Sequence, residues 1–306
     1  MGEKVWSDAD AEAFKTWVDL ETMGKDLPEM EIVSFCQSMP ADLRERLGCR
    51  PKESRWWLKL ANEVRLRSMF RLAAKGYRKA IELDPEDPWP WINLGNLEKN
   101  HLSRYQEAEA SYRRAIELDP KHALPWNGLG TLQQDHLSQY EEAEASYRRA
   151  IELDPKSAYP WSGLSQVLAR RGDAGEEARN CAIRGVMLKP DYPFARWQFR
   201  RLGWDFIDGW REVLPALLEA MAKKPQDSGL YDFAVEGLLQ YALLTAPAEA
   251  LAILEQQNSL TPFEPALDAL RVLQDRDHLH KLAPERQTVA LRLVERARSK
   301  AAKRVS

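Results

Sequence analysis

The sequence predicts an all-α protein built from stacked helix hairpins, and three observations support this fold class. Residues 105–120 read YQEAEASYRRAIELDP, and residues 140–155 repeat this stretch with a single change. The same offset of 35 residues separates the Pro-Trp pairs at 90–91, 125–126 and 160–161. Apolar residues within each period recur at three- and four-residue spacing, which is typical of helices. A fixed period of this size indicates a stacked array, because one unit cannot bury its apolar face alone.

Each period contains two predicted helices. Trp91 and Leu94 share one face of the first helix, and Tyr112 and Ala115 share one face of the second. An Asp-Pro step follows each second helix and ends it, because the residue before a proline leaves the α region and proline has no N–H to donate. Each period is therefore a helix hairpin. Small residues at the helix contacts, such as Gly95, allow the two helices to approach closely.

These residues resemble the tetratricopeptide repeat (TPR) family, whose pattern is W-x2-L-G, then A-x3-Y/F-x2-A, then P. The matching residues are Trp91, Leu94, Gly95, Ala108, Tyr112, Ala115 and Pro120 in one unit, and Trp126, Leu129, Gly130, Ala143, Tyr147, Ala150 and Pro155 in the next. The usual unit has about 34 residues, so one residue is added between Leu97 and Tyr105, which predicts a longer first helix or turn. The resemblance implies a right-handed superhelical solenoid whose first helices line a concave surface.

Composition limits the function classes. The chain of 306 residues carries a net charge of -3, which gives no global indication of nucleic-acid binding. The three cysteines (Cys36, Cys49 and Cys181) are odd in number and scattered, which favours a reducing compartment. No apolar run reaches the length of about 18 residues that a membrane span requires, and the N-terminus lacks a signal-peptide core. We expect a cytoplasmic protein without a membrane segment.

The chain divides into three predicted parts. Residues 1–55 lack the repeat signature but contain three helical patterns, and they are interpreted either as a helical cap over the first repeat or as a separate partner-binding module. Residues 56–193 form a TPR array of about four units. Residues 194–306 are predicted to be degenerate helical repeats that end in a basic C-terminal helix.

The first and fourth units are degenerate. Residues 55–85 fit the pattern through Trp57 and Tyr77, among others. In the fourth unit, Ala182 and Gly185 replace the tyrosine and alanine of the second helix, which predicts looser packing there.

The second helix of the first unit is selectively basic. Arg67, Arg71, Lys75 and Lys79 follow at four-residue spacing and therefore share one face. This stripe is interpreted as a solvated outer face or as a docking stripe for an acidic partner or a nucleic-acid backbone. The last helix, near residues 285–300, is basic as well but lacks interleaved aromatic residues.

No spacing in the sequence indicates catalysis, a metal or a cofactor. His101 and His136 are one period apart, so the array explains their repetition, and we expect a hydrogen-bonding role in the turn. His278 and His280 lie near two aspartates but without a metal-binding motif. Cys181 is mid-helix and is predicted to be buried and not nucleophilic. The protein is therefore predicted not to be an enzyme and to hold no cofactor and no metal.

The family resemblance places candidate partner-binding residues on the concave surface, and their amide, hydroxyl and charged groups suit an extended peptide or a helix. They are Asn93, Asn96, Lys99, Asn100, Asn127, Thr131, Gln134, Asp135, Gln166 and Arg170, with Trp89, Ile92, Leu124, Tyr159, Ser162 and Ala169 at further ligand-facing positions. The first hypothesis is a non-catalytic scaffold or adaptor that binds a protein or peptide and regulates an effector. The alternative is a subunit of a nucleic-acid-associated complex that docks through the basic stripe and the C-terminal helix.

Overall fold

The computed structural model describes residues 47, 50, 52–66, 68–172, 175–202, 207–224, 226–245, 247–255 and 264–274, together with scattered positions between 279 and 295. Within these ranges the secondary structure is helical and no strand occurs, so the predicted all-α class is confirmed. Contacts divide the chain into two compact units, residues 1–139 (unit 1) and 140–306 (unit 2). The proposed cap helices within residues 1–46 lie outside the described residues. The predicted domain limits at 55 and 193 remain predictions.

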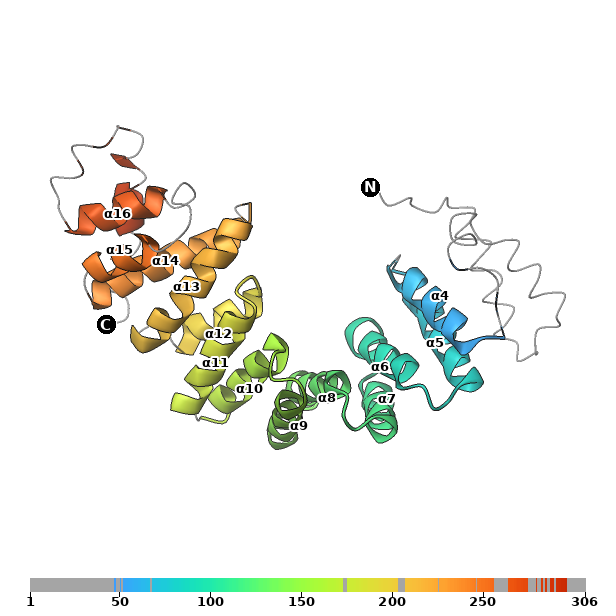
Figure 1. Cartoon of the computed structure of the whole chain (residues 1–306). Coiled ribbons are helices and arrows are strands. Elements are labelled where there is room, and N and C mark those ends of the chain that lie inside the picture. The colour runs from blue at the N-terminus through green and yellow to red at the C-terminus, as the bar shows by residue number, and fades with distance from the viewer. Residues whose placement is uncertain are drawn as a thin grey trace. The chain divides into compact units, whose positions relative to one another are not determined.

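Unit 1 is a series of packed helices (Figure 1). They are α4 (Ser54–Leu66), α5 (Phe70–Leu83), α6 (Pro88–Leu97), the π-helix η1 (Glu98–Leu102), α7 (Tyr105–Leu118) and α8 (Ala123–Asp135). Helices α4 and α5 form one hairpin and α6 and α7 the next, while α5 packs on α6 and α7 on α8. The α4/α5 hairpin lies where the sequence predicts a degenerate first unit, and Trp57, Leu60 and Tyr77 are buried in it.

In the repeat formed by α6 and α7, the added residue is accommodated at the end of the first helix. Directly after α6 the chain forms the π-helix η1, and one wider turn of this kind absorbs one extra residue. Ser103 then adopts a left-handed conformation (φ 53°) that ends the turn. The prediction of a longer first helix or turn is confirmed here.

Tyrosine and glycine fit together at the helix contacts of unit 1. A Cβ atom added at Gly95 would lie 3.0 Å from the Tyr112 ring, and one added at Gly128 would lie 2.6 Å from it. Tyr112 is fully buried between these helices. A side chain at Gly128 would overlap the ring and one at Gly95 would press against it, so both positions favour glycine.

The histidines at the end of each first helix stack on aromatic rings. His101 lies on Phe70 with ring centroids 3.8 Å apart, and His136 lies on Tyr105 at 4.1 Å. Both contacts join a first helix to the second helix of the preceding repeat. The role of these histidines is therefore ring stacking between repeats, in place of the hydrogen bond that the sequence suggested.

Unit 2 consists of α9 (Tyr140–Leu153), α10 (Ala158–Arg170), α11 (Glu176–Leu188), α12 (Pro193–Leu202), α13 (Ile207–Lys223), α14 (Ser228–Leu244), α15 (Pro247–Glu255) and α16 (Glu264–Gln274). The helices predicted beyond residue 194 are confirmed as far as α16. The last predicted helix is described only in part, with helical residues at 290–295.

The second helix of the fourth repeat packs tightly. A Cβ atom at Gly185 of α11 would lie 2.6 Å from the Ser162 hydroxyl oxygen of α10, and Ala182 is fully buried. The smaller side chains are matched by a closer approach of the helices, so no space is left between them. The prediction of looser packing in this repeat is wrong for that reason.

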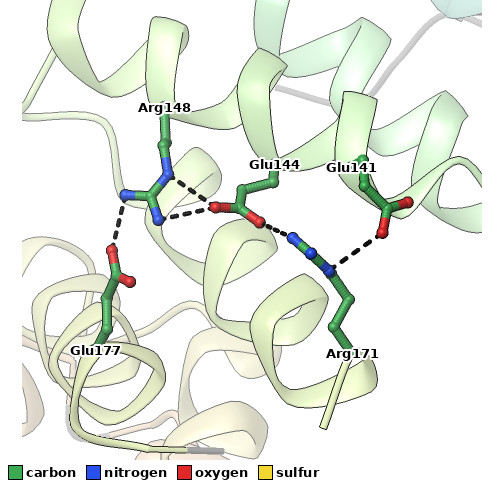
Figure 2. Close-up of polar contacts among 5 residues, drawn as sticks. All are labelled: Glu141, Glu144, Arg148, Arg171 and Glu177. Carbon is green, nitrogen blue, oxygen red and sulfur yellow. Dashed lines mark hydrogen bonds and ion pairs between the residues drawn. The ribbon is translucent and has the colours of Figure 1, made fainter. Parts of the chain in front are cut away.

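An ion-pair network links three helical segments of unit 2 (Figure 2). Arg148 of α9 donates to Glu144 through Nε (3.0 Å) and Nη2 (2.9 Å), and to Glu177 of α11 through Nη1 (2.7 Å). Arg171, at the end of α10, donates to the other oxygen of Glu144 and lies 3.4 Å from Glu141. Glu144 therefore accepts hydrogen bonds from two guanidinium groups, one on α9 and one at the end of α10. These charge-assisted bonds join the two helices at the protein surface.

Candidate partner-binding surfaces

The first-helix surface of unit 1 has an exposed apolar end. Trp89 is 45% exposed and Leu124 is 48% exposed. They are 35 residues apart and hold equivalent positions near the start of α6 and α8. The ring of His122, which caps α8 through its Nδ1, makes an edge contact with Trp89 at 4.8 Å. Exposed aromatic and leucine side chains at equivalent positions give this surface two apolar anchors.

The opposite end of the same surface is polar. Gln134 Nε2 donates to Asp135 Oδ1 at 2.7 Å, and Asn100 is exposed. Burial lowers the pKa of the Lys99 ammonium, and the nearby Asp135 carboxylate partly offsets this shift. The structure therefore places the Lys99 ammonium close to the Asp135 carboxylate, whereas Gln134 is only 2% exposed and adds little to the accessible surface.

Other predicted binding residues hold the fold. The Tyr112 hydroxyl donates to Asn96 Oδ1 at 2.7 Å, so this amide secures the α6/α7 hairpin. Thr131 donates to the backbone oxygen of Asn127, and Asn127 Oδ1 is buried without a hydrogen-bond partner among the described residues. Asn93 is half-buried. The amides of Asn96 and Asn127 thus contribute less accessible surface than the sequence suggested.

The equivalent positions in unit 2 are more buried. Gln166 is 7% exposed and Ser162 is fully buried, with its hydroxyl bonded to Ala158 O. Arg170 is exposed and lies 5.9 Å from the centroid of the Tyr140 ring. Tyr159 is 42% exposed. Arg170 and Tyr159 are therefore the accessible members of this set in unit 2.

The predicted basic stripe lies on α5. Arg71 is exposed, Lys75 is half-buried, and Lys79 forms an ion pair with Glu82 at 3.0 Å. Arg67 lies outside the described residues. The stripe stays a prediction, and at Lys79 the neighbouring Glu82 already compensates the positive charge.

Two accessible features were missed by reasoning from the sequence. His122 joins the apolar end of unit 1, and Trp197 of α12 is 47% exposed although the matching leucines of earlier repeats are buried. The alternation of aromatic and basic residues at positions 192–201 is the signal that could have drawn attention to Trp197.

The described part of the chain has neither a metal-binding cluster nor a membrane-spanning helix. There, no three His, Cys, Asp or Glu side chains gather closely enough to hold a metal ion. His278 and His280 lie outside the described residues. None of the described helices combines the length and apolar character that crossing a membrane requires.

The stacked hairpins define a helical repeat protein, and family comparison identifies the repeat. Two tetratricopeptide repeat models match, one to residues 88–156 and the other to residues 136–180. Residues 88–180 are therefore tetratricopeptide repeats, as the sequence pattern predicted. No curated protein matches the chain.

Several solved structures are similar to the chain at low identity. The crystal structure of MamA is 18% identical, with coverage of 59% of this chain and 93% of that chain and a TM-score of 0.41. YrrB, described as a TPR protein with an unusual peptide-binding site, is 24% identical, with coverage of 62% and 97% and a TM-score of 0.41. A tetratricopeptide repeat protein from Parabacteroides merdae is 17% identical, with coverage of 80% and 93% and a TM-score of 0.43.

Proposed function

We propose that this protein is a non-catalytic scaffold or adaptor that binds a segment of a partner protein on the first-helix surface of unit 1. TPR domains as a family bind proteins and peptides, and the family is generally non-catalytic. The observation that carries the proposal is the pair Trp89 and Leu124, which are exposed at equivalent positions of α6 and α8. The odd number of scattered cysteines favours action in the cytoplasm.

The surface supports binding of an extended segment with one apolar and one polar part. Apolar side chains of the segment would pack on Trp89 and Leu124, since aromatic anchors commonly dominate interface energetics. Its backbone would meet Asn100, whose amide can both donate and accept hydrogen bonds. The Lys99 ammonium and the Asp135 carboxylate, close to one another, add charged groups at the far end of the surface.

The test compares partner capture by matched variants. Wild type, a Trp89→Ser/Leu124→Ser variant and a Leu66→Ser control are used as baits in native lysate, and each eluate is treated with nuclease. Leu66 is 68% exposed and lies at the end of α4, whereas Trp89 and Leu124 lie near the starts of α6 and α8. We expect a nuclease-resistant protein partner that the control retains and the double variant loses.

Two results would contradict the proposal. One is equal capture by the double variant and wild type. The other is a partner that disappears on nuclease treatment, which would favour a nucleic-acid-associated role through the basic residues of α5 and the C-terminal helix.

A further inference from the structure

One side of unit 2 carries a chain of four aromatic rings around the start of α12. The ring centroids lie 5.0 Å apart between Tyr159 and Tyr192, 5.9 Å between Tyr192 and Phe194, and 5.8 Å between Phe194 and Trp197. Tyr159 is 42% exposed and Trp197 is 47% exposed. Contiguous exposed apolar surface of this kind commonly marks an interaction site.

The position of Trp197 in the repeat makes its exposure unusual. The Tyr-Pro pairs at 159–160 and 192–193 are 33 residues apart, so Trp197 corresponds to Leu164 and, one and two periods earlier, to Leu129 and Leu94. These leucines are only 2%, 4% and 3% exposed. Helix α12 packs against α10, α11 and α14, whereas α13 packs against α11 and α14. In the earlier hairpins, the second helix covers this face of the first helix. On α12 the same face carries Trp197, which is exposed.

Two cations lie over these rings. Lys189 Nζ is 4.7 Å from the centroid of Tyr159 and 5.9 Å from that of Tyr192, and it donates to the Tyr159 hydroxyl at 2.5 Å. Arg201 Cζ is 5.8 Å from the Trp197 centroid. Cation–π contacts hold both groups next to the rings, and their remaining N–H donors can bind an anion.

The charge around the rings is positive and only partly compensated. Residues 189–202 contain four basic residues and one acidic residue. The acidic residue, Asp191, already pairs with Lys224, and Arg200 pairs with Glu236. Among the described residues, no carboxylate lies within ion-pair distance of Lys189 or Arg201.

At the repeat position before the loop proline, the charge of the side chain changes from negative to positive. The residue before the loop proline is acidic in the three preceding repeats, at Asp84, Asp119 and Asp154, and it becomes Lys189 here. Asp119 and Asp154 accept a hydrogen bond from the backbone N–H two residues later, so they stabilise their own turns. Lys189 instead extends to a neighbouring ring, which adds positive charge beside the aromatic chain.

We propose that the α12 aromatic surface, formed by Tyr159, Lys189, Tyr192, Phe194, Trp197 and Arg201, docks an acidic peptide segment of a partner protein. Carboxylates of the segment bind Lys189 and Arg201, and its apolar side chains pack against Trp197 and Tyr159. Tryptophan, tyrosine and arginine are the residues most enriched at interface hot spots. This surface lies in unit 2 and shares no residue with the unit 1 surface of the proposed function.

The arrangement of the rings favours a peptide over single-stranded nucleic acid. Proteins bind single strands by stacking bases on open aromatic faces. Here a face of Trp197 is stacked on Phe194 and Arg201 lies over the ring, while Lys189 lies over Tyr159. The ring edges and the cationic groups therefore stay accessible to a partner. The cationic groups suit carboxylates, and the ring edges suit aliphatic side chains.

The test selects ligands without knowledge of the natural partner. A phage-displayed library of random dodecapeptides is selected on the full-length protein, with depletion on a Trp197→Ala/Arg201→Glu variant. Enriched peptides are synthesised, and their dissociation constants are measured with wild type and with single variants at Trp197, Arg201 and Lys189. We expect peptides rich in Asp or Glu next to apolar residues, and an affinity loss of about tenfold or more for Trp197→Ala and for Arg201→Glu.

Controls separate this surface from general effects. Arg184→Glu reverses an exposed charge on α11, and Leu291→Ala removes an apolar side chain that is 40% exposed, so both are expected to bind as wild type does. Circular dichroism confirms that each variant is folded. The Trp89→Ser/Leu124→Ser variant is also expected to bind normally, which separates this proposal from the proposed function.

Three outcomes would overturn the proposal. The first is enrichment of peptides that are not acidic, and the second is enrichment of peptides whose affinity is unchanged by Trp197→Ala and Arg201→Glu. The third is tighter, α12-dependent binding of fluorescent single-stranded dT12 or of vesicles containing anionic lipid, which would assign the surface to a different class of partner.

Discussion

The Tyr112 hydroxyl donates a hydrogen bond of 2.7 Å to Asn96 Oδ1, and this contact ties the second helix of a repeat to its first. The same relationship recurs one repeat earlier, where the Tyr77 hydroxyl donates to Asn62 at 2.7 Å. Both tyrosines are fully buried, so each hydroxyl needs a partner inside the protein. The amide that the family resemblance assigns to ligand binding therefore has a structural role.

Replacing Asn96 by alanine is expected to destabilise the fold. The buried Tyr112 hydroxyl would lose its acceptor, which costs about 1–2 kcal/mol of unfolding free energy. Urea denaturation followed by circular dichroism measures this loss, and Asn100→Ala is the control because Asn100 is exposed. Equal stability of Asn96→Ala and Asn100→Ala would mean that the hydrogen bond does not contribute.

Alanine at the glycines that face tyrosine is expected to destabilise in a defined order. An added Cβ would lie 2.3 Å from Tyr147 at Gly163, 2.6 Å from Tyr112 at Gly128 and 3.0 Å from Tyr112 at Gly95. Overpacking costs about 1–3 kcal/mol, and it opposes a gain in helix propensity of about 1 kcal/mol. We expect Gly163→Ala and Gly128→Ala to lower the melting temperature more than Gly95→Ala does. A rise in melting temperature for Gly163→Ala would contradict the packing.

The fold could be predicted because its determinants repeat. Tyr112 and Gly95 recur at a fixed spacing together with the Pro-Trp and Asp-Pro steps, so periodicity alone located the hairpins. Even the degenerate α4/α5 hairpin could be placed, since Trp57 and Tyr77 keep their positions.

The binding surface was harder to predict, because a polar side chain on the predicted ligand-facing side of a helix can form a hydrogen bond within the protein. Whether Asn96 meets solvent depends on Tyr112, sixteen residues later and on another helix. The exposure of Trp197 depends on how α12 and α13 pack, which the pattern of one helix does not contain.

Glu98 is expected to make stability depend on pH. It is 1% exposed, accepts from Ser111 at 3.0 Å and pairs with Arg78 at 3.1 Å. Burial raises the pKa of Glu98 above its ordinary value, while Ser111 and Arg78 act in the opposite direction. The folded state therefore holds the proton of Glu98 more tightly than the unfolded chain does. The stability that this protonation adds to the fold is fully present below the unfolded pKa, and it is lost as the pH rises through the folded pKa.

Glu98→Gln tests this linkage. Glutamine occurs at the equivalent position 133 of the next repeat, so the side chain fits the repeat. We expect the variant to gain stability relative to wild type as the pH increases from 4 to 8, measured by urea denaturation at several pH values. A difference that is constant with pH, or that favours wild type at high pH, would contradict the assignment.

The ion-pair network of unit 2 is expected to contribute modestly and to depend on salt. Glu144 is 18% exposed and pairs with Arg148 and Arg171 (Figure 2), whereas Glu152 is 63% exposed and pairs with Arg149 at 2.8 Å. We expect Glu144→Gln to cost about 1 kcal/mol and Glu152→Gln to cost less, because exposed pairs contribute little. In 1 M NaCl the difference should shrink as screening increases. A difference that is unchanged by salt would exclude an electrostatic origin.

Cys181 is expected to react only when unit 2 opens. The thiol is 3% exposed on α11, and burial raises its pKa to about 12, so the reactive thiolate is scarce at neutral pH. In a Cys36→Ser/Cys49→Ser background, iodoacetamide labelling followed by mass spectrometry should be far slower than for a free thiol, and urea should accelerate it in parallel with unfolding. Gly163→Ala should also accelerate it, because that substitution loosens the contact between α9 and α10. Rapid labelling of the folded protein without urea would show that α11 is accessible in the native state.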